Sequence, residues 1–336
     1  MRLLVLAASD VREALGYADC AAAMREILAA RARGEVFQPL RSVYAPPGAA
    51  GRMALMPAYS GGEDGSFALK SLCLMPDNPP ERDSHQGVVV LSHSDTGEPL
   101  AVLNASAVTE IRTAAVSALA TEFLARPGAD SLAIIGTGVQ ARAHLRAIAA
   151  SRPLREARIA GRTPDRAAAF AAVAEPPGSP AAGVTIIATA SAEEALAGAG
   201  IVVTATSSAE PVLRREWLAP GAHVNAVGAC LPHLREIDTA TMITAALFAD
   251  SRQSMLAEAG DYLIPAAAGE LGPDQIRAEL GDLIIGAPGA PGAVGRSDPA
   301  EITLFESLGL AIEDLAAGFA AYRVARRRGL GELVEF

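Results

Sequence analysis

The amino-acid sequence predicts an α/β protein, in which a doubly wound parallel-sheet domain is joined to a second domain of the α+β type. The length of 336 residues allows about two domains. Residues 131–228 alternate between unbroken apolar strands and helices, which is typical of a parallel sheet covered on both faces. Residues 1–105 instead hold short apolar segments separated by turns rich in Gly, Pro and Asp, which favours hairpins.

The first part of the chain is expected to hold a strand, a helix and a set of hairpins. Residues 1–7 form the strand, and Ser9-Asp10 caps a helix that extends to about residue 33. Short strands are expected over 41–46, 52–60, 67–74, 87–94 and 99–105. An Ala-rich helix over 107–126 follows and ends at Pro127-Gly128.

The second part of the chain has the regular alternation. Strands are expected over 131–136, 156–162, 184–189, 201–206 and 223–228, with helices between most of them. Residues 265–300 are rich in Gly, Pro and Ala and are expected to contain a surface loop at 287–296. We expect residues 301–330 to form a long final helix that ends in a solvated Arg-rich turn.

The composition excludes several classes of protein. The net charge of −10 argues against nucleic acid as a main partner, since phosphate backbones require basic surfaces. No apolar run approaches the roughly 18 residues of a membrane-spanning helix. The three cysteines, Cys20, Cys73 and Cys230, lack CxxC spacing, which argues against a disulfide framework and a zinc site. We therefore expect a cytoplasmic protein with no metal and no membrane partner.

A glycine-rich turn marks a candidate dinucleotide site. It reads Gly136-Thr-Gly138-Val-Gln-Ala141 and joins an apolar strand to a helix. Gly136 permits the tight turn, Gly138 lets the backbone approach a pyrophosphate, and Ala141 occupies the close-packed third position. The helix N-terminus would hold the phosphates, as in the Rossmann fold. The alternative is a glycine turn that binds no ligand.

The end of the next strand favours NADP(H) over NAD(H). An NAD enzyme places Asp or Glu there, against the ribose 2′-hydroxyl. This chain has Arg162 and Thr163 instead, with Arg166 one helical turn later. Because a guanidinium suits a phosphate better than a hydroxyl, we expect NADPH/NADP as the cofactor, with NADH less favoured. The alternative is that Arg162 is a solvated surface charge.

One cation in the first domain is unusual. The chain has 28 Lys and Arg residues, and Lys70 is the only lysine among them. It lies inside an expected strand, where a charge is costly unless it meets an anion. Arg41 and Arg112 also lie on or beside apolar segments, so the three cations are candidates to hold one small carboxylate. The alternative is three unrelated surface cations.

Several segments resemble the ornithine cyclodeaminase/mu-crystallin family, in order and at similar spacing. They are MPAYS (56–60), SHQG (84–87), TGEPLAVLNA (96–105), RTAAVSALA (112–120), GTGVQARAH (136–144), HVNAVGA (223–229) and LFESLGLAIED (304–314). The resemblance implies a homodimer of two-domain subunits. Residues 1–115 with 308–336 would form the substrate-binding and dimerisation domain, and residues 116–307 the Rossmann domain.

The resemblance also implies roles for single residues. Arg41, Lys70 and Arg112 match residues that bind the substrate carboxylate, and Lys70 and Arg112 are the expected catalytic residues. Met56 and Cys230 stand at further substrate-binding positions. The positions that match residues near the cofactor are Ser84, His85, Arg112, Thr113, Gly138, Val139, Gln140, Arg162, Thr163, Thr206, Val227 and Ser307, and the motifs described above add Gly136 and Arg166 to the expected cofactor site.

Two departures from the ornithine cyclodeaminase pattern narrow the expected activity. Ala54 stands where those enzymes carry Glu, and Cys230 stands where they carry a catalytic Asp. Without these carboxylates a diamino acid loses its counter-charge and its proton acceptor, since a thiol accepts protons poorly at neutral pH. The mu-crystallin type has a small neutral residue at the second position and is an NADPH-dependent ketimine reductase. We therefore expect reduction of small cyclic imino acids, Δ1-pyrroline-2-carboxylate to L-proline and Δ1-piperideine-2-carboxylate to L-pipecolate.

Two alternatives to this activity stay open at the level of sequence. The first is an ornithine cyclodeaminase or an NAD(P)-dependent amino-acid dehydrogenase, and the second is a non-catalytic NADP-binding protein. Cys230 is expected to be a small neutral filler rather than a nucleophile. His144, on the helix after the glycine turn, is expected to be structural or near the cofactor rather than catalytic.

Overall fold

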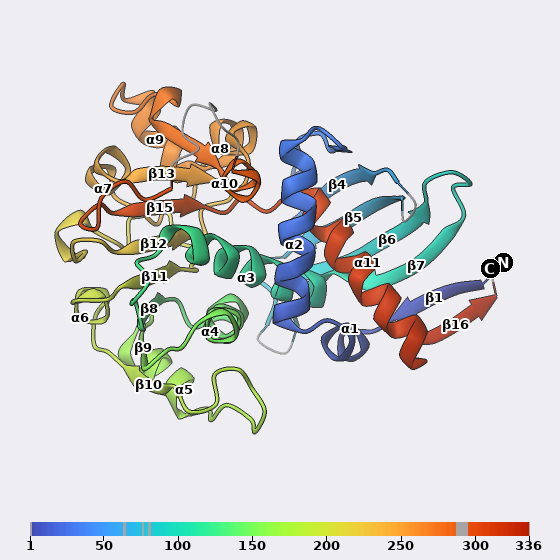
Figure 1. Cartoon of the computed structure of the whole chain (residues 1–336), viewed down its shortest axis with the longest axis horizontal. Helices are drawn as coiled ribbons and strands as arrows, with labels where there is room; N and C mark the ends of the chain where they lie inside the picture. Colours follow the sequence, from blue (N-terminus) through green and yellow to red (C-terminus); the bar gives the residue numbers. More distant parts are fainter. Residues whose placement is uncertain (1, 63–64, 76, 80–81, 287–294, 336) are drawn as a thin grey trace. The chain divides into compact units, whose positions relative to one another are not determined.

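The computed structural model describes residues 2–62, 65–75, 77–79, 82–286 and 295–335, and the chain divides into two compact units (Figure 1). Unit 1 comprises Met1–Arg112 and Leu310–Phe336, and unit 2 comprises Thr113–Gly309. The chain thus leaves unit 1, forms unit 2 and returns to unit 1. Each unit contains its own eight-stranded sheet, which confirms the predicted α/β class.

Unit 1 is a mixed sheet. Its strands, in spatial order, are β16 (Glu332–Glu335), β1 (Arg2–Leu6), β7 (Pro99–Asn104), β6 (His85–His93), β5 (Ser66–Leu74), β4 (Arg52–Ser60) and β2 (Val36–Phe37), and β3 (Ser42–Tyr44) also pairs with β4. Strand β1 runs parallel to β7, whereas the other pairs are antiparallel. The helices α1 (Ala8–Ala14), α2 (Tyr17–Ala32) and α11 (Ala311–Arg328) also belong to this unit.

Helix α11 covers one face of this sheet (Figure 1). The strands alternate, so Lys70, Met56 and Val89 lie on one face as cross-strand neighbours, and all three are buried. Gly318 of α11 lies so close to this face that a Cβ atom there would be 3.5 Å from the side chains of Leu91 and Val89. Lys70 therefore lies beneath a helix that begins more than two hundred residues later in the chain.

Unit 2 is an all-parallel sheet. Its strands, in spatial order, are β10 (Thr185–Ala188), β9 (Glu156–Ala160), β8 (Ser131–Ile135), β11 (Ile201–Thr204), β12 (His223–Ala226), β15 (Thr303–Glu306), β13 (Ala246–Ala249) and β14 (Ile276–Glu279). The first five have the order of a doubly wound sheet, in which the chain direction across the sheet reverses between β8 and β11. Ligands bind such sheets outside the carboxyl ends of the strands at this reversal.

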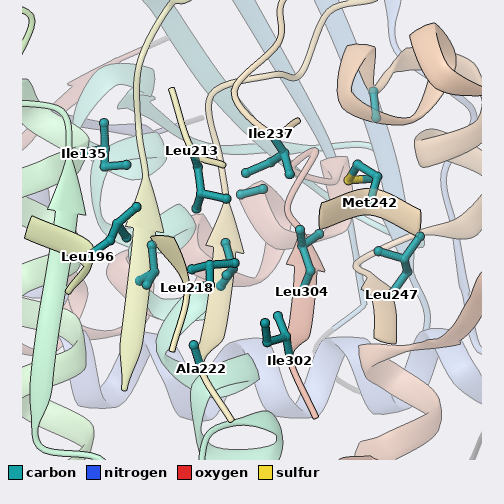
Figure 2. Close-up of a cluster of buried hydrophobic side chains, with 14 of the residues drawn as sticks. Ile135, Leu196, Leu213, Leu218, Ala222, Ile237, Met242, Leu247, Ile302 and Leu304 are labelled. Carbon is teal, nitrogen blue, oxygen red and sulfur yellow. The ribbon is translucent and has the colours of Figure 1, made fainter. Parts of the chain in front are cut away.

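The remaining helices connect the strands of unit 2. They are α3 (Ala105–Leu124), which begins in unit 1, α4 (Val139–Ser151), α5 (Pro164–Ala172), α6 (Ala192–Leu196), α7 (Thr239–Thr244), α8 (Arg252–Glu258), α9 (Gly260–Ala267) and α10 (Leu280–Ile285), with short 3-10 helices at Arg215–Trp217 and Pro273–Gln275. Figure 2 shows the apolar cluster of this unit, to which three strands contribute Ile135, Leu304 and Leu247 and to which Ile237 and Met242 also belong. These three strands are buried along their whole length, as is typical of a parallel sheet that is covered on both faces.

Some expectations about single elements are wrong. The final helix begins at Ala311 rather than at residue 301, because the buried segment Thr303–Glu306 pairs with β12 on one side and β13 on the other. The expected helix over residues 9–33 is two helices, since the buried Leu15 adopts an extended conformation between them. The first of them begins at Ala8, and Asp10 accepts a hydrogen bond from the Ala7 N–H instead of acting as the cap residue.

Other outcomes concern the end of the chain and the expected loop. Strand β16 lies outside the expected elements and pairs with β1. The Arg-rich end of α11 is exposed, as expected. Most of the surface loop expected at 287–296 lies outside the described residues. In the part of the chain that the structure describes, every helix is too short or too polar to cross a bilayer.

Candidate functional site

Two cations and two carboxylates meet in the interior of unit 1. Lys70 Nζ lies 2.7 Å from Asp314 Oδ2, and the Arg112 Nε–H donates a 3.0 Å hydrogen bond to Asp314 Oδ1. A second guanidinium N–H of Arg112 donates to Glu313 Oε2 at 2.8 Å. None of the four residues is more than 4% exposed. We call Lys70, Arg112, Glu313 and Asp314 the buried charge cluster.

Local structure explains why these residues meet. The alternation of β5 turns Lys70 toward α11, and the first turn of α11 carries Glu313 and Asp314. Glu313 Oε2 also accepts a hydrogen bond from the Leu310 N–H at 3.1 Å, which stabilises this helix end. Gln38 binds the N–H of Ile312 through its side-chain oxygen at 2.9 Å. The two acids therefore have fixed positions on the face of α11 that packs against the sheet.

The anion that a buried Lys70 requires is supplied inside the chain by Asp314. Lys70 and Arg112 are therefore not unrelated surface cations, since both are buried and both bind Asp314. Arg41 is half-buried, and its charge acts on Lys70. Binding of a substrate carboxylate by these three cations stays a prediction.

The cluster changes the acidity of its members. Burial lowers the pKa of Lys70 from 10.5 to about 8; Asp314 opposes this shift, and the charges of Arg112 and Arg41 reinforce it. The pKa of His85 is also lowered, first by partial removal of its imidazole from water and then by the charges of Lys70 and Arg112. Burial raises the pKa of Glu313, against the opposing charge of Arg112. Lys70 thus releases its proton more readily than a solvated lysine does.

The glycine-rich turn of unit 2 has the geometry that phosphate binding needs. Gly136 has a φ of 133°, and a Cβ atom there would lie 2.4 Å from the Ala205 carbonyl oxygen, so only glycine fits. Gly138 is the N-cap of α4, and a Cβ atom on it would have no neighbour within 4 Å. Open space therefore lies before the first turn of α4, where free N–H groups and the helix dipole favour an anion. These residues fit the pyrophosphate of a dinucleotide.

Most of the other predicted cofactor positions of unit 2 follow its strands or lie at the start of α4, whereas Thr113 lies within α3. Arg162, Thr163 and Arg166 follow β9 and are exposed. Thr206 and Val227 follow β11 and β12 and are half-buried, and Ser307 follows β15 and is buried. Val139 is exposed and Gln140 half-buried in the first turn of α4, and the buried Thr113 is the first residue of unit 2. The predicted cofactor positions Ser84, His85 and Arg112 belong to unit 1, where Ser84 Oγ lies 3.0 Å from His85 Nδ1.

Three further residues singled out in the sequence have apolar or structural surroundings. Ala54 is buried on the face of β4 that α11 covers. Cys230 is half-buried and packs against the apolar cluster of unit 2, which fits a filler. His144 is buried, with Nδ1 2.7 Å from the Gln140 carbonyl oxygen and Nε2 3.0 Å from Ser117 Oγ. Burial lowers the pKa of His144 to about 4, so the ring is neutral and links α4 to α3.

Two acids of the buried charge cluster were missed as site residues at the level of sequence. Glu313 and Asp314 stand at the end of the segment LFESLGLAIED, directly after four residues without a polar side chain, Gly309 to Ile312. Adjacent acids at the start of a helix are often only dipole partners on the surface. The available signal was that the surrounding residues are apolar on both sides, which predicts burial and hence a need for cations.

The chain is similar to a known protein family, to characterised relatives and to solved structures. The model of the ornithine cyclodeaminase/mu-crystallin family matches residues 1–328. Ketimine reductase mu-crystallin of Mus musculus is 38% identical over 289 residues, which is 86% of this chain and 85% of that protein. The structure of Thermococcus litoralis Δ1-pyrroline-2-carboxylate reductase in complex with NADH and L-proline has a TM-score of 0.92 and 32% identity, and the match covers 99% of this chain and 100% of that one. An archaeal alanine dehydrogenase dimer with bound NAD has a TM-score of 0.90 and 28% identity, with both chains covered completely.

Because Lys70 is the only lysine, its titration can be followed without any assignment step. In protein labelled with ¹³C at lysine Cε, we expect one resonance whose midpoint lies near pH 8. Asp314→Asn should move this midpoint to lower pH, since the negative charge of Asp314 favours the ammonium form. Glu35→Gln, which alters an exposed ion pair with Arg33, should leave it unchanged. A midpoint at the ordinary lysine value of about 10.4 would contradict the burial of Lys70.

Proposed function

Because this chain belongs to the ornithine cyclodeaminase/mu-crystallin family, we propose that it is a reductase of cyclic ketimine carboxylates. The substrates are Δ1-pyrroline-2-carboxylate, reduced to L-proline, and Δ1-piperideine-2-carboxylate, reduced to L-pipecolate, with NADPH as the reductant. The observation that carries the proposal is a buried pair of cations, Lys70 and Arg112, in a chain that lacks the acids of a cyclodeaminase at Ala54 and Cys230. The relatives named above as reductases support the reaction class.

In this proposal Arg112 and Lys70 bind the substrate carboxylate, assisted by the charge of Arg41. The ammonium of Lys70 has three N–H donors. In the described part of the chain its partners are Asp314 at 2.7 Å and the Thr109 hydroxyl at 3.5 Å. A donor of Lys70 is therefore available for a carboxylate oxygen. Met56, the cross-strand neighbour of Lys70, adds an apolar side chain suited to the ring methylene groups.

Reduction of the imine requires one hydride at C2 and one proton at the ring nitrogen. A nicotinamide cofactor supplies the hydride when it is bound. A protonated nitrogen withdraws electrons from C2, so proton donation must accompany or precede reduction. Lys70 is the donor in our proposal, since a pKa of about 8 keeps it charged at neutral pH and still lets it release a proton. Solvent then returns a proton to Lys70.

The rival reaction, cyclisation of ornithine with loss of ammonia, is disfavoured by the same residues. It needs an anion for the side-chain amine and a base for proton removal. Ala54 offers a methyl group on a buried surface, and Cys230 offers a thiol. A non-catalytic role is disfavoured because the ion pair of Lys70 is costly to bury and apolar residues would fill its place without that cost.

The preference for NADPH rests on the end of β9. Arg162, Thr163 and Arg166 are exposed there, and their guanidinium and hydroxyl groups are suited to a 2′-phosphate. The T. litoralis relative is in complex with NADH, so the fold by itself does not decide between the two cofactors. The side chains after β9 are what favours NADPH in this chain.

We also propose that two copies of the chain pair through the open face of the unit 1 sheet. Met53, Phe67, Leu69 and Val88 lie on the face opposite α11 and are 41%, 48%, 37% and 38% exposed. A monomer rarely exposes large apolar side chains together, and such patches mark protein interfaces. The dimer of the archaeal alanine dehydrogenase relative supports this choice of partner.

The first test is turnover. Purified protein should oxidise NADPH with Δ1-pyrroline-2-carboxylate or its six-membered analogue. Lys70→Met should lower kcat/KM about 100-fold or more, because a proton donor and a carboxylate contact are both lost. Lys70→Arg should restore KM more than kcat, since a guanidinium binds carboxylate but holds its proton. Steady-state kinetics with circular dichroism as the folding control measures this; proline formed from ornithine without imine reduction would overturn the proposal.

The second test concerns cofactor choice. Arg162→Ala should raise KM for NADPH about tenfold or more and leave KM for NADH within about twofold, because only NADPH carries the 2′-phosphate. Arg155→Ala removes a surface guanidinium that pairs with Glu156 and should change neither value. Equal losses for the two cofactors would show that Arg162 does not contact the phosphate.

The third test concerns assembly. Wild-type protein should sediment at twice the mass of the chain. The double variant Phe67→Glu with Leu69→Glu should weaken association about tenfold or more, since two charges would be buried in an apolar interface. Val173→Glu, at an exposed apolar residue of unit 2, should leave the dimer intact. Sedimentation velocity over a concentration series measures this, and an unchanged dimer in the double variant would place the interface elsewhere.

A further inference from the structure

One buried carboxylate connects the ends of two neighbouring strands in unit 2. Glu236 is fully buried and lies in the segment of the chain that connects β12 to α7. Its Oε2 accepts hydrogen bonds from the Thr204 hydroxyl at 2.9 Å and the Gly228 N–H at 2.6 Å, and its Oε1 accepts one from the Thr206 N–H at 2.6 Å. Thr204 ends β11, and Gly228 follows β12. Both oxygens are thus acceptors, and the donors come from two different segments.

Glu236 is itself held firmly. Asp261 of α9 accepts hydrogen bonds from the backbone N–H groups of Glu236 and Ile237, at 2.7 Å and 2.9 Å. Ile237 belongs to the apolar cluster of Figure 2. A Cβ atom on Gly228 would lie 2.6 Å from the Glu236 carboxyl carbon and 2.1 Å from the Thr206 carbonyl oxygen. The carboxylate therefore packs directly against both segments, with no room for a larger residue at position 228.

These two segments lie where a doubly wound sheet binds its ligand. Strand β11 adjoins β8, whose end carries the glycine-rich turn, and the Ala205 carbonyl oxygen is the atom that excludes a side chain at Gly136. Thr206 and Val227 stand on the two segments that Glu236 joins. The carboxylate thus binds the backbone of one predicted cofactor residue, Thr206, and the backbone of Gly228, which is next to the other, Val227.

We propose that Glu236 is a positioning residue that holds the segments after β11 and β12 in the arrangement that accepts the nicotinamide-ribose half of the cofactor. The proposal rests on the proposed binding of a nicotinamide dinucleotide. Glu236 acts through the backbone of Thr206 and Gly228. The adenine half depends on different residues, those after β9 and at the start of α4.

The hydrogen bonds at the site favour the charged form of Glu236, because they oppose the rise that burial causes in its pKa. A Gln side chain has nearly the same shape, but its NH₂ group would face a donor wherever it is placed, because both oxygens of Glu236 accept. Glu306, on the end of β15, is an equally buried acid of the same unit. Burial and the neighbouring acids raise the pKa of Glu306 well above its ordinary value, so a Gln there mimics the protonated side chain. Glu306→Gln is therefore a matched control for Glu236→Gln.

The experiment measures binding to the free protein by calorimetry, with two ligands. NADPH occupies the whole dinucleotide site, whereas adenosine 2′,5′-bisphosphate occupies only its adenine half. For Glu236→Gln we expect the dissociation constant of NADPH to rise about tenfold or more and that of the bisphosphate to stay within about twofold. Glu306→Gln should bind both ligands as the wild type does. NADH with 5′-ADP forms a second pair, run in the same way.

The other outcomes are also decisive. If Glu236→Gln weakens both ligands equally, or lowers the thermal midpoint together with all binding, then Glu236 only supports the fold and the proposal is overturned. If it binds NADPH as the wild type does, the proposal is overturned and the proposed function stands. If the wild type binds neither dinucleotide, the proposed function fails first and the inference fails with it.

Discussion

The buried charges of unit 1 depend on one carboxylate, that of Asp314. It binds both Lys70 and Arg112, and these side chains come from α11, β5 and α3. A buried ion pair adds little net stability, because desolvation offsets the attraction, but removal of one partner leaves an uncompensated charge at a cost of about 3–5 kcal/mol. The pairing therefore fixes where the first turn of α11 lies on the sheet. It also explains how a chain that leaves unit 1 at Arg112 and returns at Leu310 places its last long helix over Lys70.

Buried charged groups also need partners in unit 2, but there the groups are acids and most partners are neutral hydrogen-bond donors. Its buried acids have few cations near them, so they depend on N–H and O–H donors. Glu236 has three such donors. Burial, followed by repulsion from Glu236, raises the pKa of Asp261 to about 8, so Asp261 is mostly protonated at neutral pH. Burial raises the pKa of Glu236 as well, and the hydrogen bonds from Thr206, Gly228 and Thr204 oppose that shift and so favour its charged form. A carboxylate with this arrangement stiffens the strand ends on which a ligand site is built.

The sequence predicts local features better than long-range pairs. Alternation along β5 predicts that Lys70 lies in a strand, and the glycine-rich turn predicts the start of α4, because both depend on neighbouring residues. Strand β15 was expected to be helical, since its short apolar segment continues into a helical pattern and only its pairing with β12 and β13 makes it a strand. The partners of Lys70 and Glu236 could not be predicted in this way. Arg112, which shares Asp314 with Lys70, is 202 residues away from that acid in the sequence. The donors to Glu236 come from the ends of separate strands. Such contacts follow from the packing of elements, and the sequence indicates only that a buried charge needs a partner.

Within the proposed reaction, the choice of amino acid at position 70 favours proton transfer over carboxylate binding alone. The chain has 28 Lys and Arg residues and uses Arg for all of them except Lys70. A guanidinium would bind a carboxylate at least as well, through two parallel hydrogen bonds, so carboxylate binding gives no reason to keep a lysine there. An ammonium differs because it can lose its proton, and burial brings the pKa of Lys70 to about 8, which no guanidinium reaches. Asp314 keeps the proton on Lys70 at neutral pH, and the nearby charges of Arg112 and Arg41 ease its release. A lysine is thus the residue that suits the proposed reaction, in which one side chain both holds an anionic substrate and protonates its imine nitrogen.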